Sequence, residues 1–333
     1  MELAMSLSSL SHVALGLLAL VGAAAIALAS MLAWPVRPPP PLASIHAGAK
    51  EIDATGAPDL SRFQARDGTW LAYRVYPAQN GARDRIAILA HGSSASSIEM
   101  NAVAKALAGA GVTAAALDIR GHGASGTRHD IAYPGQLDYD LADLIAELRK
   151  AYPAVRFSLI GHSAGGGFAL RVAGSPLGDA FDRFVLLAPY LGYSAPTNRP
   201  AEGPGLWASP DLPRIRATVI LEKLGIDWPQ SLPALAFANV PEAKMSVTSQ
   251  YSFRLMSNYT APPDWQGAFE RAKGRVSVIA GADDQLMDAE AYKHTLPPLG
   301  VPVTILPGVD HMGIVYNAEA MKAILAAMAE GDS

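Results

Sequence analysis

The sequence predicts an α/β fold in which a mostly parallel sheet carries helices on both faces. From Phe63 onward, short and nearly continuous apolar runs alternate with helical patterns, as in the strands and crossovers of a parallel sheet. The same alternation returns near the C-terminus after a long irregular segment. A length of 333 residues suits one large domain of this kind with an insertion. A charge-free apolar segment precedes the domain, so we also expect a helix outside the core.

Composition excludes several classes of protein. Half of the residues are hydrophobic, 17% are charged and the formal net charge is −4, with Lys and Arg dispersed along the chain. Without a basic stripe, we expect no nucleic-acid partner. The chain has no cysteine, which rules out disulfides, a thiolate nucleophile and a Cys-ligated zinc or iron site.

Residues 1–36 are predicted to be a single-pass membrane anchor. They hold one acidic residue, at position 2, and no Lys or Arg. The uncharged run Val13–Trp34 would form a helix roughly 33 Å long, enough to cross a bilayer core. A cleaved signal peptide is the alternative, because Ala27 and Ala29 form an A-x-A pattern, but the basic residues that usually begin such peptides are missing. A buried core helix is the third interpretation.

Residues 37–62 are rich in proline and are predicted to be a spacer between membrane and folded domain. The positive charges that flank the apolar run, Arg37 and Lys50, lie on its C-terminal side. By the positive-inside rule they favour a cytoplasmic position for the domain.

Residues 63–333 are predicted to form the α/β domain, with an inserted cap at about 189–272. The insertion is proline-rich, has little strand pattern and is too long for an ordinary loop. Two interpretations of its apolar side chains stay open, a substrate pocket or a small core of the cap itself. These side chains are Trp207, Trp228, Trp265, Tyr190, Tyr193, Phe237, Phe253, Met245 and Met256.

The stretch "SLIGHSAGGGFAL", residues 158–170, places Ser163 at a predicted strand-to-helix junction. Gly161 and Gly165 complete the pattern G-x-S-x-G, the nucleophile elbow, in which larger side chains would collide with the neighbouring strand and helix. The elbow exposes the hydroxyl and directs helix N–H groups toward a developing negative charge. A tight packing turn is the alternative interpretation of the motif alone.

A serine nucleophile needs a base and an orienting carboxylate, in the chain order Ser, Asp or Glu, His. "VIAGADDQLMD" ends a predicted strand with Asp283 and Asp284, and "LPGVDHMGIV" places His311 in the loop after the final strand. We predict Asp284 as the acid, with Asp283 as the alternative. Asp310 is expected to form a turn.

An oxyanion hole is predicted at "AILAHGSSASS", where a strand runs into His91, Gly92 and Ser93. Glycine lets the backbone approach the substrate, and the N–H of Ser93 would act together with that of Ala164. A plain β-turn is the alternative for this segment alone.

In this order the motifs "HGSS", "DIRGHGASG", "GHSAGG", "AGADD" and "DHMG" resemble those of the α/β-hydrolase superfamily. The resemblance is stronger for the branch of monoacylglycerol lipases, lysophospholipases and serine aminopeptidases, and it covers about Phe63 to the C-terminus. It implies an α/β-hydrolase fold with a catalytic triad of Ser163, Asp284 and His311, and with Ser93 and Ala164 as oxyanion donors. The N-terminal apolar segment departs from most soluble members.

Other motifs are interpreted as structural. The "DIRGHG" run recurs as a turn in the family, so Asp118, Arg120 and His122 are expected to be structural. It overlaps a G-x-G-x-x-G pattern, but no phosphate-facing helix follows at "TRHDIAYPG". The histidines lack the spacing of metal ligands. We therefore expect neither a metal nor another cofactor.

The predicted function is a serine esterase that cleaves acyl esters through an acyl-enzyme intermediate. An apolar cap and a membrane anchor favour small lipid-like substrates such as lysophospholipids or monoacylglycerols. A serine aminopeptidase is the first alternative, because the same triad cleaves amides. A catalytically silent membrane scaffold that keeps the fold is the second.

Overall fold

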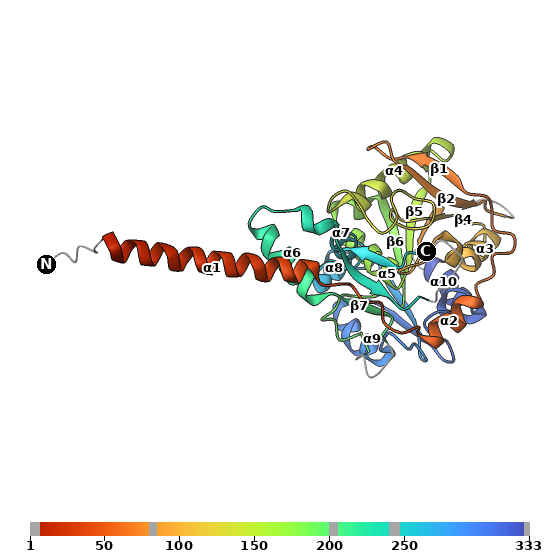
Figure 1. Ribbon diagram of the computed structural model, residues 1–333. Helices are drawn as coiled ribbons and strands as arrows, with labels where there is room; N and C mark the ends of the chain where they lie inside the picture. The colour runs from red at the N-terminus through yellow and green to blue at the C-terminus, as the bar shows by residue number, and fades with distance from the viewer. Residues whose placement is uncertain (1–6, 80–84, 200–205, 240–246, 330–333) are drawn as a thin grey trace.

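The computed structural model describes residues 7–79, 85–199, 206–239 and 247–329. Within them, an eight-stranded sheet has the order β1-β2-β4-β3-β5-β6-β10-β11 (Figure 1). β1 and β2 are antiparallel to their neighbours, and the other strands are parallel. The strands are β1 Ser61–Gln64, β2 Trp70–Tyr76, β3 Arg85–Ala90, β4 Thr113–Leu117, β5 Arg156–His162, β6 Phe181–Leu187, β10 Val276–Gly281 and β11 Val303–Leu306.

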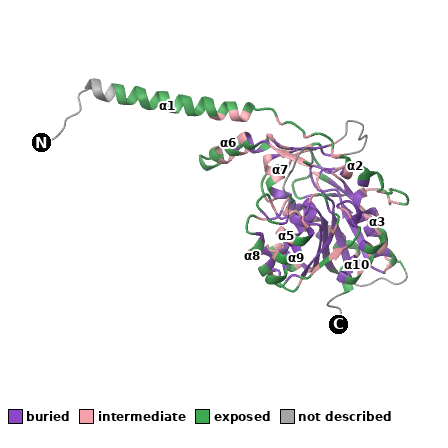
Figure 2. Ribbon diagram, turned by 90° about the horizontal axis from the view of Figure 1, so that it is seen from below, coloured by how far each residue is buried: buried purple, intermediate pink, exposed green. Residues whose placement is uncertain are grey.

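Helices cover both faces of the sheet, and each face has its own buried core (Figure 2). Strand β3 shows why: Ile86 and Ile88 point into one core, and Ala87 and Leu89 point into the other, as the two-residue period of a strand requires. The predicted fold class is thus confirmed. One face packs against α3 Asn101–Gly109 and α10 Ala318–Ala329, and the other against α4 Gln136–Ala151, α5 Ala164–Ala173, α8 Trp265–Arg271 and α9 Ala289–Thr295.

A second, three-stranded antiparallel sheet in the order β7-β8-β9 lies in the segment between β6 and β10. The sequence predicted little strand structure here, because runs of three to five residues are too short to show a two-residue period. The elements are β7 Ala208–Pro210, α6 Leu212–Lys223, β8 Pro233–Phe237, β9 Gln250–Ser252 and α7 Phe253–Asn258. Short 3₁₀ helices complete the fold: η1 Ser97–Met100, η2 Pro176–Ala180, η3 Trp228–Ser231, η4 Pro297–Leu299 and η5 Gly313–Val315.

Helix α1, Leu7–Ala33, extends away from the domain (Figure 1). Its segment His12–Ala33 has a mean hydropathy of 2.4 and is not buried against the rest of the protein. This exposure excludes the buried core helix. The segment is long and apolar enough to cross a membrane, a property that signal sequences share.

Residues 37–62, expected as a spacer, contain the short helix α2, Ala43–Lys50. Ile45 is buried, and the ring of His46 lies 2.6 Å from the carbonyl oxygen of Ala238. Gly48 lets α2 approach Met312 closely, since a Cβ at position 48 would lie 2.5 Å from Cβ of Met312. This segment therefore packs on the domain, which its local composition did not indicate.

Candidate active site

Ser163 occupies a sharp turn between β5 and α5, at the carboxyl edge of the sheet. Its backbone has a φ of +53°, an unfavourable value for a residue with a side chain. A Cβ on Gly161 would lie 2.1 Å from the carbonyl oxygen of Gly165, and one on Gly165 would lie 2.4 Å from that of His91. Only glycine fits at either position, and the tight turn holds the serine at the start of the helix.

His311 and Asp284 meet beside this turn. Nδ1 of His311 lies 2.8 Å from Oδ2 of Asp284, and both residues are buried. The other carboxylate oxygen, Oδ1, accepts hydrogen bonds from the N–H groups of Leu286 and Met287 at 2.8 and 2.7 Å. The structure thus brings Asp284 against the imidazole. Its neighbour Asp283 is exposed. The loops after β10 and β11 deliver the two side chains from neighbouring strands.

The electrostatics of the pair favour its charged form. Burial opposes ionisation of Asp284, but the charge and hydrogen bond of His311 hold the pKa of the carboxyl below its usual value. Burial likewise opposes a charge on His311, whereas the Asp284 carboxylate raises the pKa of the imidazole above its usual value. Because Nδ1 faces Asp284, a proton transfer to His311 would take place at the other ring nitrogen, Nε2.

A second buried histidine and carboxylate lie next to this pair. Nδ1 of His162 lies 2.6 Å from Oε1 of Glu99, and the same oxygen accepts the N–H of Gly92 at 2.7 Å. Nε2 of His162 donates to the carbonyl oxygen of His311 at 3.1 Å. Glu99 and His162 therefore connect the loop of Gly92, the turn of Ser163 and the loop of His311.

The ring of His162 is held at both nitrogens. They face two acceptors, the carboxylate of Glu99 and the carbonyl oxygen of His311. Burial opposes a charge on Glu99, but the neighbouring His162 holds the pKa of that carboxyl below its usual value. Glu99 was not among the residues predicted from the sequence. The available signal was its isolation, because it is the one charged residue between His91 and Lys105.

The two predicted oxyanion donors come from different loops, because Ala164 directly follows Ser163 and Ser93 lies in the loop after β3. Ala164 is the first residue of α5, so its N–H has no acceptor within the helix. Ser93 follows the end of β3, and its hydroxyl accepts a 2.8 Å hydrogen bond from the indole Nε1 of Trp207. The next residue, Ser94, donates its N–H to the hydroxyl of Tyr251 at 3.0 Å. Side chains from the segment between β6 and β10 thus hold this loop.

His91 and His122 are structural. Nε2 of His91 accepts the N–H of Ile119 at 3.2 Å, and Nε2 of His122 lies 2.6 Å from the hydroxyl of Tyr251. Burial lowers the pKa of both rings, so both are neutral. The hydroxyl of Tyr259 also donates to the carbonyl oxygen of His91. Among the residues that the structure describes, no group of three or more His, Asp or Glu side chains could hold a metal ion.

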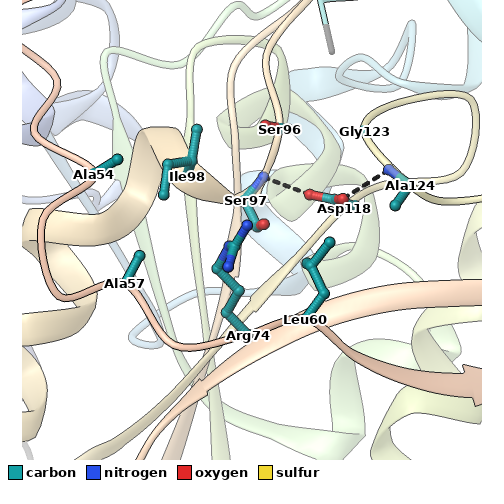
Figure 3. A pocket seen from close by; sticks show the side chains of 10 residues that line it. All are labelled: Ala54, Ala57, Leu60, Arg74, Ser96, Ser97, Ile98, Asp118, Gly123 and Ala124. Carbon is teal, nitrogen blue, oxygen red and sulfur yellow. Dashed lines mark hydrogen bonds between the residues drawn. The ribbon is translucent and has the colours of Figure 1, made fainter. Parts of the chain in front are cut away.

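Asp118 and Arg120 also stabilise loops. Asp118 accepts the N–H groups of Ser97 and Ala124 at 2.7 and 2.8 Å (Figure 3). Arg120 forms ion pairs with Asp67 and Asp140 at 2.9 and 2.6 Å. A cavity of about 440 Å³ lies beside Asp118, and none of the predicted site residues lines it. Figure 3 shows its walls, which are Ala54, Ala57, Leu60, Arg74, Ser96, Ser97, Ile98, Asp118, Gly123 and Ala124.

The aromatic side chains of the predicted cap have different surroundings. Phe237 is buried, and its ring centroid lies 5.7 Å from that of Trp207. Trp265 packs against Phe269 within α8. Tyr193 and Trp228 are exposed. Met245 lies outside the described residues. Trp207 bonds directly to Ser93, so an aromatic side chain of this segment adjoins the predicted oxyanion loop.

The sheet order, the strand-turn-helix at Ser163 and the loops that meet beside it define an α/β hydrolase. Residues 81–312 match the model of the family described as serine aminopeptidase, S33. Because this match spans well over half of the chain, the protein belongs to that family.

Solved structures share the fold at low sequence identity. A soluble variant of monoglyceride lipase from Saccharomyces cerevisiae, bound to a substrate analog, has a TM-score of 0.61 and 17% identity over 82% of this chain and 94% of its own. A monoacylglycerol lipase from Paleococcus ferrophilus has a TM-score of 0.53 and 19% identity over 77% and 99%. An enol-lactonase from Burkholderia xenovorans has a TM-score of 0.56 and 17% identity over 81% and 100%. These similarities support the fold alone.

Proposed function

We propose that this protein is a serine hydrolase of carboxylic esters, with Ser163 as nucleophile, His311 as base and Asp284 as the orienting acid. The observation that carries the proposal is the buried 2.8 Å contact between His311 and Asp284 beside the strained turn of Ser163. In this proposal residues 63–333 are the catalytic domain, and about 189–272 are its cap.

The first half of the reaction forms an acyl-enzyme. Nε2 of His311 takes the proton of Ser163 while Oγ attacks the ester carbonyl. The N–H groups of Ser93 and Ala164 stabilise the oxyanion. Collapse of the tetrahedral intermediate breaks the bond to the alcohol, which leaves with the proton from His311. Asp284 keeps the imidazole in the required tautomer and stabilises its charged form.

The second half repeats these steps with water. His311 removes a proton from a water molecule, which attacks the acyl-enzyme carbonyl through a second oxyanion. The intermediate expels Oγ of Ser163, which regains its proton from His311, and the carboxylic acid is released. No cofactor enters either half.

We infer that the substrates are lipid-like acyl esters, such as monoacylglycerols or lysophospholipids. The half-buried indole of Trp207, which packs on the buried Phe237, is an apolar group beside Ser93 and is suited to contact an acyl chain. Two of the similar structures are lipases of monoglycerides or monoacylglycerols, which agrees with this substrate class.

We also propose that α1 is a retained single-pass anchor, with the domain on the cytoplasmic side. Its charge-free length supports the anchor, and the flanking Arg37 and Lys50 support the orientation. Full-length protein should stay with membranes through a carbonate wash. Recovery of a soluble chain that begins near Ser30 would instead identify a signal peptide.

A serine aminopeptidase is the second candidate, favoured by the description of the matched family. Hydrolysis of p-nitrophenyl acyl esters and of aminoacyl p-nitroanilides by the same preparation separates the two. The esterase proposal predicts hydrolysis of esters by the wild-type protein, and background rates for Ser163→Ala. A preference for the anilides would support the aminopeptidase.

A further inference from the structure

Helix α6 lies beside the end of α1, so the segment between β6 and β10 meets the apolar helix directly. Figures 1 and 2 both place α6 alongside the last turns of α1. There Leu28, Met31 and Leu32 are half-buried, whereas the described side chains before them on α1 are exposed. The contact is therefore confined to the C-terminal end of the apolar helix.

Arg214 fixes this contact. Its guanidinium is buried and donates from Nε to the carbonyl oxygen of Leu32 at 2.9 Å. The other nitrogens donate to the carbonyl oxygens of Trp34 and Pro233. The last carbonyl groups of a helix lack N–H donors within it, and a cation there is favourable. Arg214 thus caps α1 and ties its end to β8.

The end of α6 and the residues that follow it present apolar side chains to solvent. Leu224 is 67% exposed and Trp228 is 63% exposed, and Ile220 and Ile226 are also exposed. Arg216, Glu222, Lys223 and Asp227 are interspersed among them. Exposed Trp and aliphatic side chains among charged residues suit the headgroup region of a bilayer, where charged ends reach water and apolar groups enter lipid.

We propose that the segment Leu212–Trp228 is a second membrane contact, which rests on the same leaflet that α1 enters. The occupant of this surface is the lipid bilayer, because the surface is continuous with the end of a helix suited to lipid and is fixed to it by Arg214. The contact orients the domain, so that the segment between β6 and β10, which reaches Ser93 through Trp207, faces the membrane that holds a lipid-like ester. This inference rests on the proposed anchor and deepens the proposed function.

The test uses the full chain, whose lack of cysteine permits single labels. Leu224→Cys and Trp228→Cys would carry an environment-sensitive NBD fluorophore in nanodiscs of phosphatidylcholine. Leu20→Cys, within α1, is the control for lipid. Trp70→Cys, in β2 on the other side of the domain, is the control for water (Figure 1). The rate on a soluble ester and the thermal unfolding of each labelled chain report its folding.

We expect labels at positions 20, 224 and 228 to shift to the blue and to be quenched by brominated phosphatidylcholine, and the label at position 70 to do neither. A quenched label at 20 with a water-exposed label at 224 would contradict the second contact and leave the anchor intact. A label at 224 that is shielded from water but unaffected by brominated lipid would indicate a protein partner and also overturn the proposal. A water-exposed label at 20 would overturn the anchor and this inference together.

Arg214→Ala tests whether the contact of Arg214 with the end of α1 positions the second membrane contact. Arg216→Ala, at an exposed residue of the same helix, is the matched control. We expect Arg214→Ala to reduce quenching at position 224, and Arg216→Ala to leave it unchanged. Leu224→Asp should lower the rate on bilayer esters roughly tenfold relative to a soluble ester, the factor that corresponds to burial of one leucine. Fluorescence requires no turnover, so it distinguishes a failure of docking from a failure of the proposed esterase.

Discussion

The carboxylate of Glu99 and the ring of His162 form a buried pair, 2.6 Å apart, directly beside the pair of Asp284 and His311. Glu99 holds the loop of Gly92, and His162 precedes Ser163 and donates to the backbone of His311. One buried hydrogen-bonded pair therefore sets the relative positions of three loops that the proposed reaction needs. Its members act as positioning residues.

Glu99→Gln is expected to destabilise the fold by about 3 kcal/mol, because it removes the buried carboxylate that accepts hydrogen bonds from both Gly92 and His162. The pKa of Glu99 lies below its usual value, so its contribution is present at neutral pH and is lost as the pH falls through the folded-state value. Urea denaturation at neutral pH measures the loss. The control is Glu290→Gln, which breaks an exposed pair with Lys293 and should cost less than about 1 kcal/mol. Equal small losses would contradict the structural role.

Asp284→Asn should lower kcat on p-nitrophenyl esters by about four orders of magnitude, because the imidazole loses the anion that fixes its tautomer. The matched control is Asp283→Asn, an exposed neighbour that should stay within about threefold of wild type. Reversed results would show that Asp283 is the acid.

The pH profile of kcat/KM should report the state of His311. Activity rises with pH as the base loses its proton, and Asp284 raises the pKa of the imidazole, so the midpoint of the acid limb is expected above the usual value of 6.5. In Asp284→Asn the midpoint should move to lower pH. Rates on a soluble ester from about pH 5 to about pH 9 measure both. A midpoint that is unchanged in the variant would contradict the coupling.

Gly165→Ala should lower the free energy of unfolding by about 2–3 kcal/mol or prevent folding, because the new Cβ would lie 2.4 Å from backbone oxygen of His91. Gly109→Ala, at the end of α3, is the matched control, since a Cβ there has no neighbour within 4 Å. It should be neutral or stabilise by up to about 1 kcal/mol. Comparable losses at both positions would contradict the packing argument for the elbow.

The sequence predicted the features that local pattern encodes. Continuous apolar strands with intervening helices defined the sheet, and the pattern of glycines around Ser163 defined the turn. Gly161 avoids a collision with Gly165, a close neighbour in the chain, whereas the contact of Gly165 with the backbone of His91 is long-range and emerges only in the structure. The order of Ser163, Asp284 and His311 also follows from the chain. Choosing Asp284 over Asp283 from local pattern was less certain, and the contact with His311 supplies the geometric reason.

Long-range contacts were beyond local pattern. Glu99 meets His162 across 63 positions, and Arg214 reaches the end of α1 across 182. No local sequence motif at these residues predicts which residue each of them contacts. The small sheet of β7, β8 and β9 was also missed, since its pairing depends on neighbours in space more than on a run of strand-forming residues.

The central claim is that Ser163 is the nucleophile, and an active-site fluorophosphonate probe tests it most directly. Peptide mapping of the labelled full-length protein should place one phosphonyl group on the peptide that contains Ser163. The adduct should be absent in Ser163→Ala and strongly reduced in His311→Ala, in variants that keep the thermal unfolding of the wild type. Labelling that survives in Ser163→Ala, or an adduct mapped to another residue, would contradict the account.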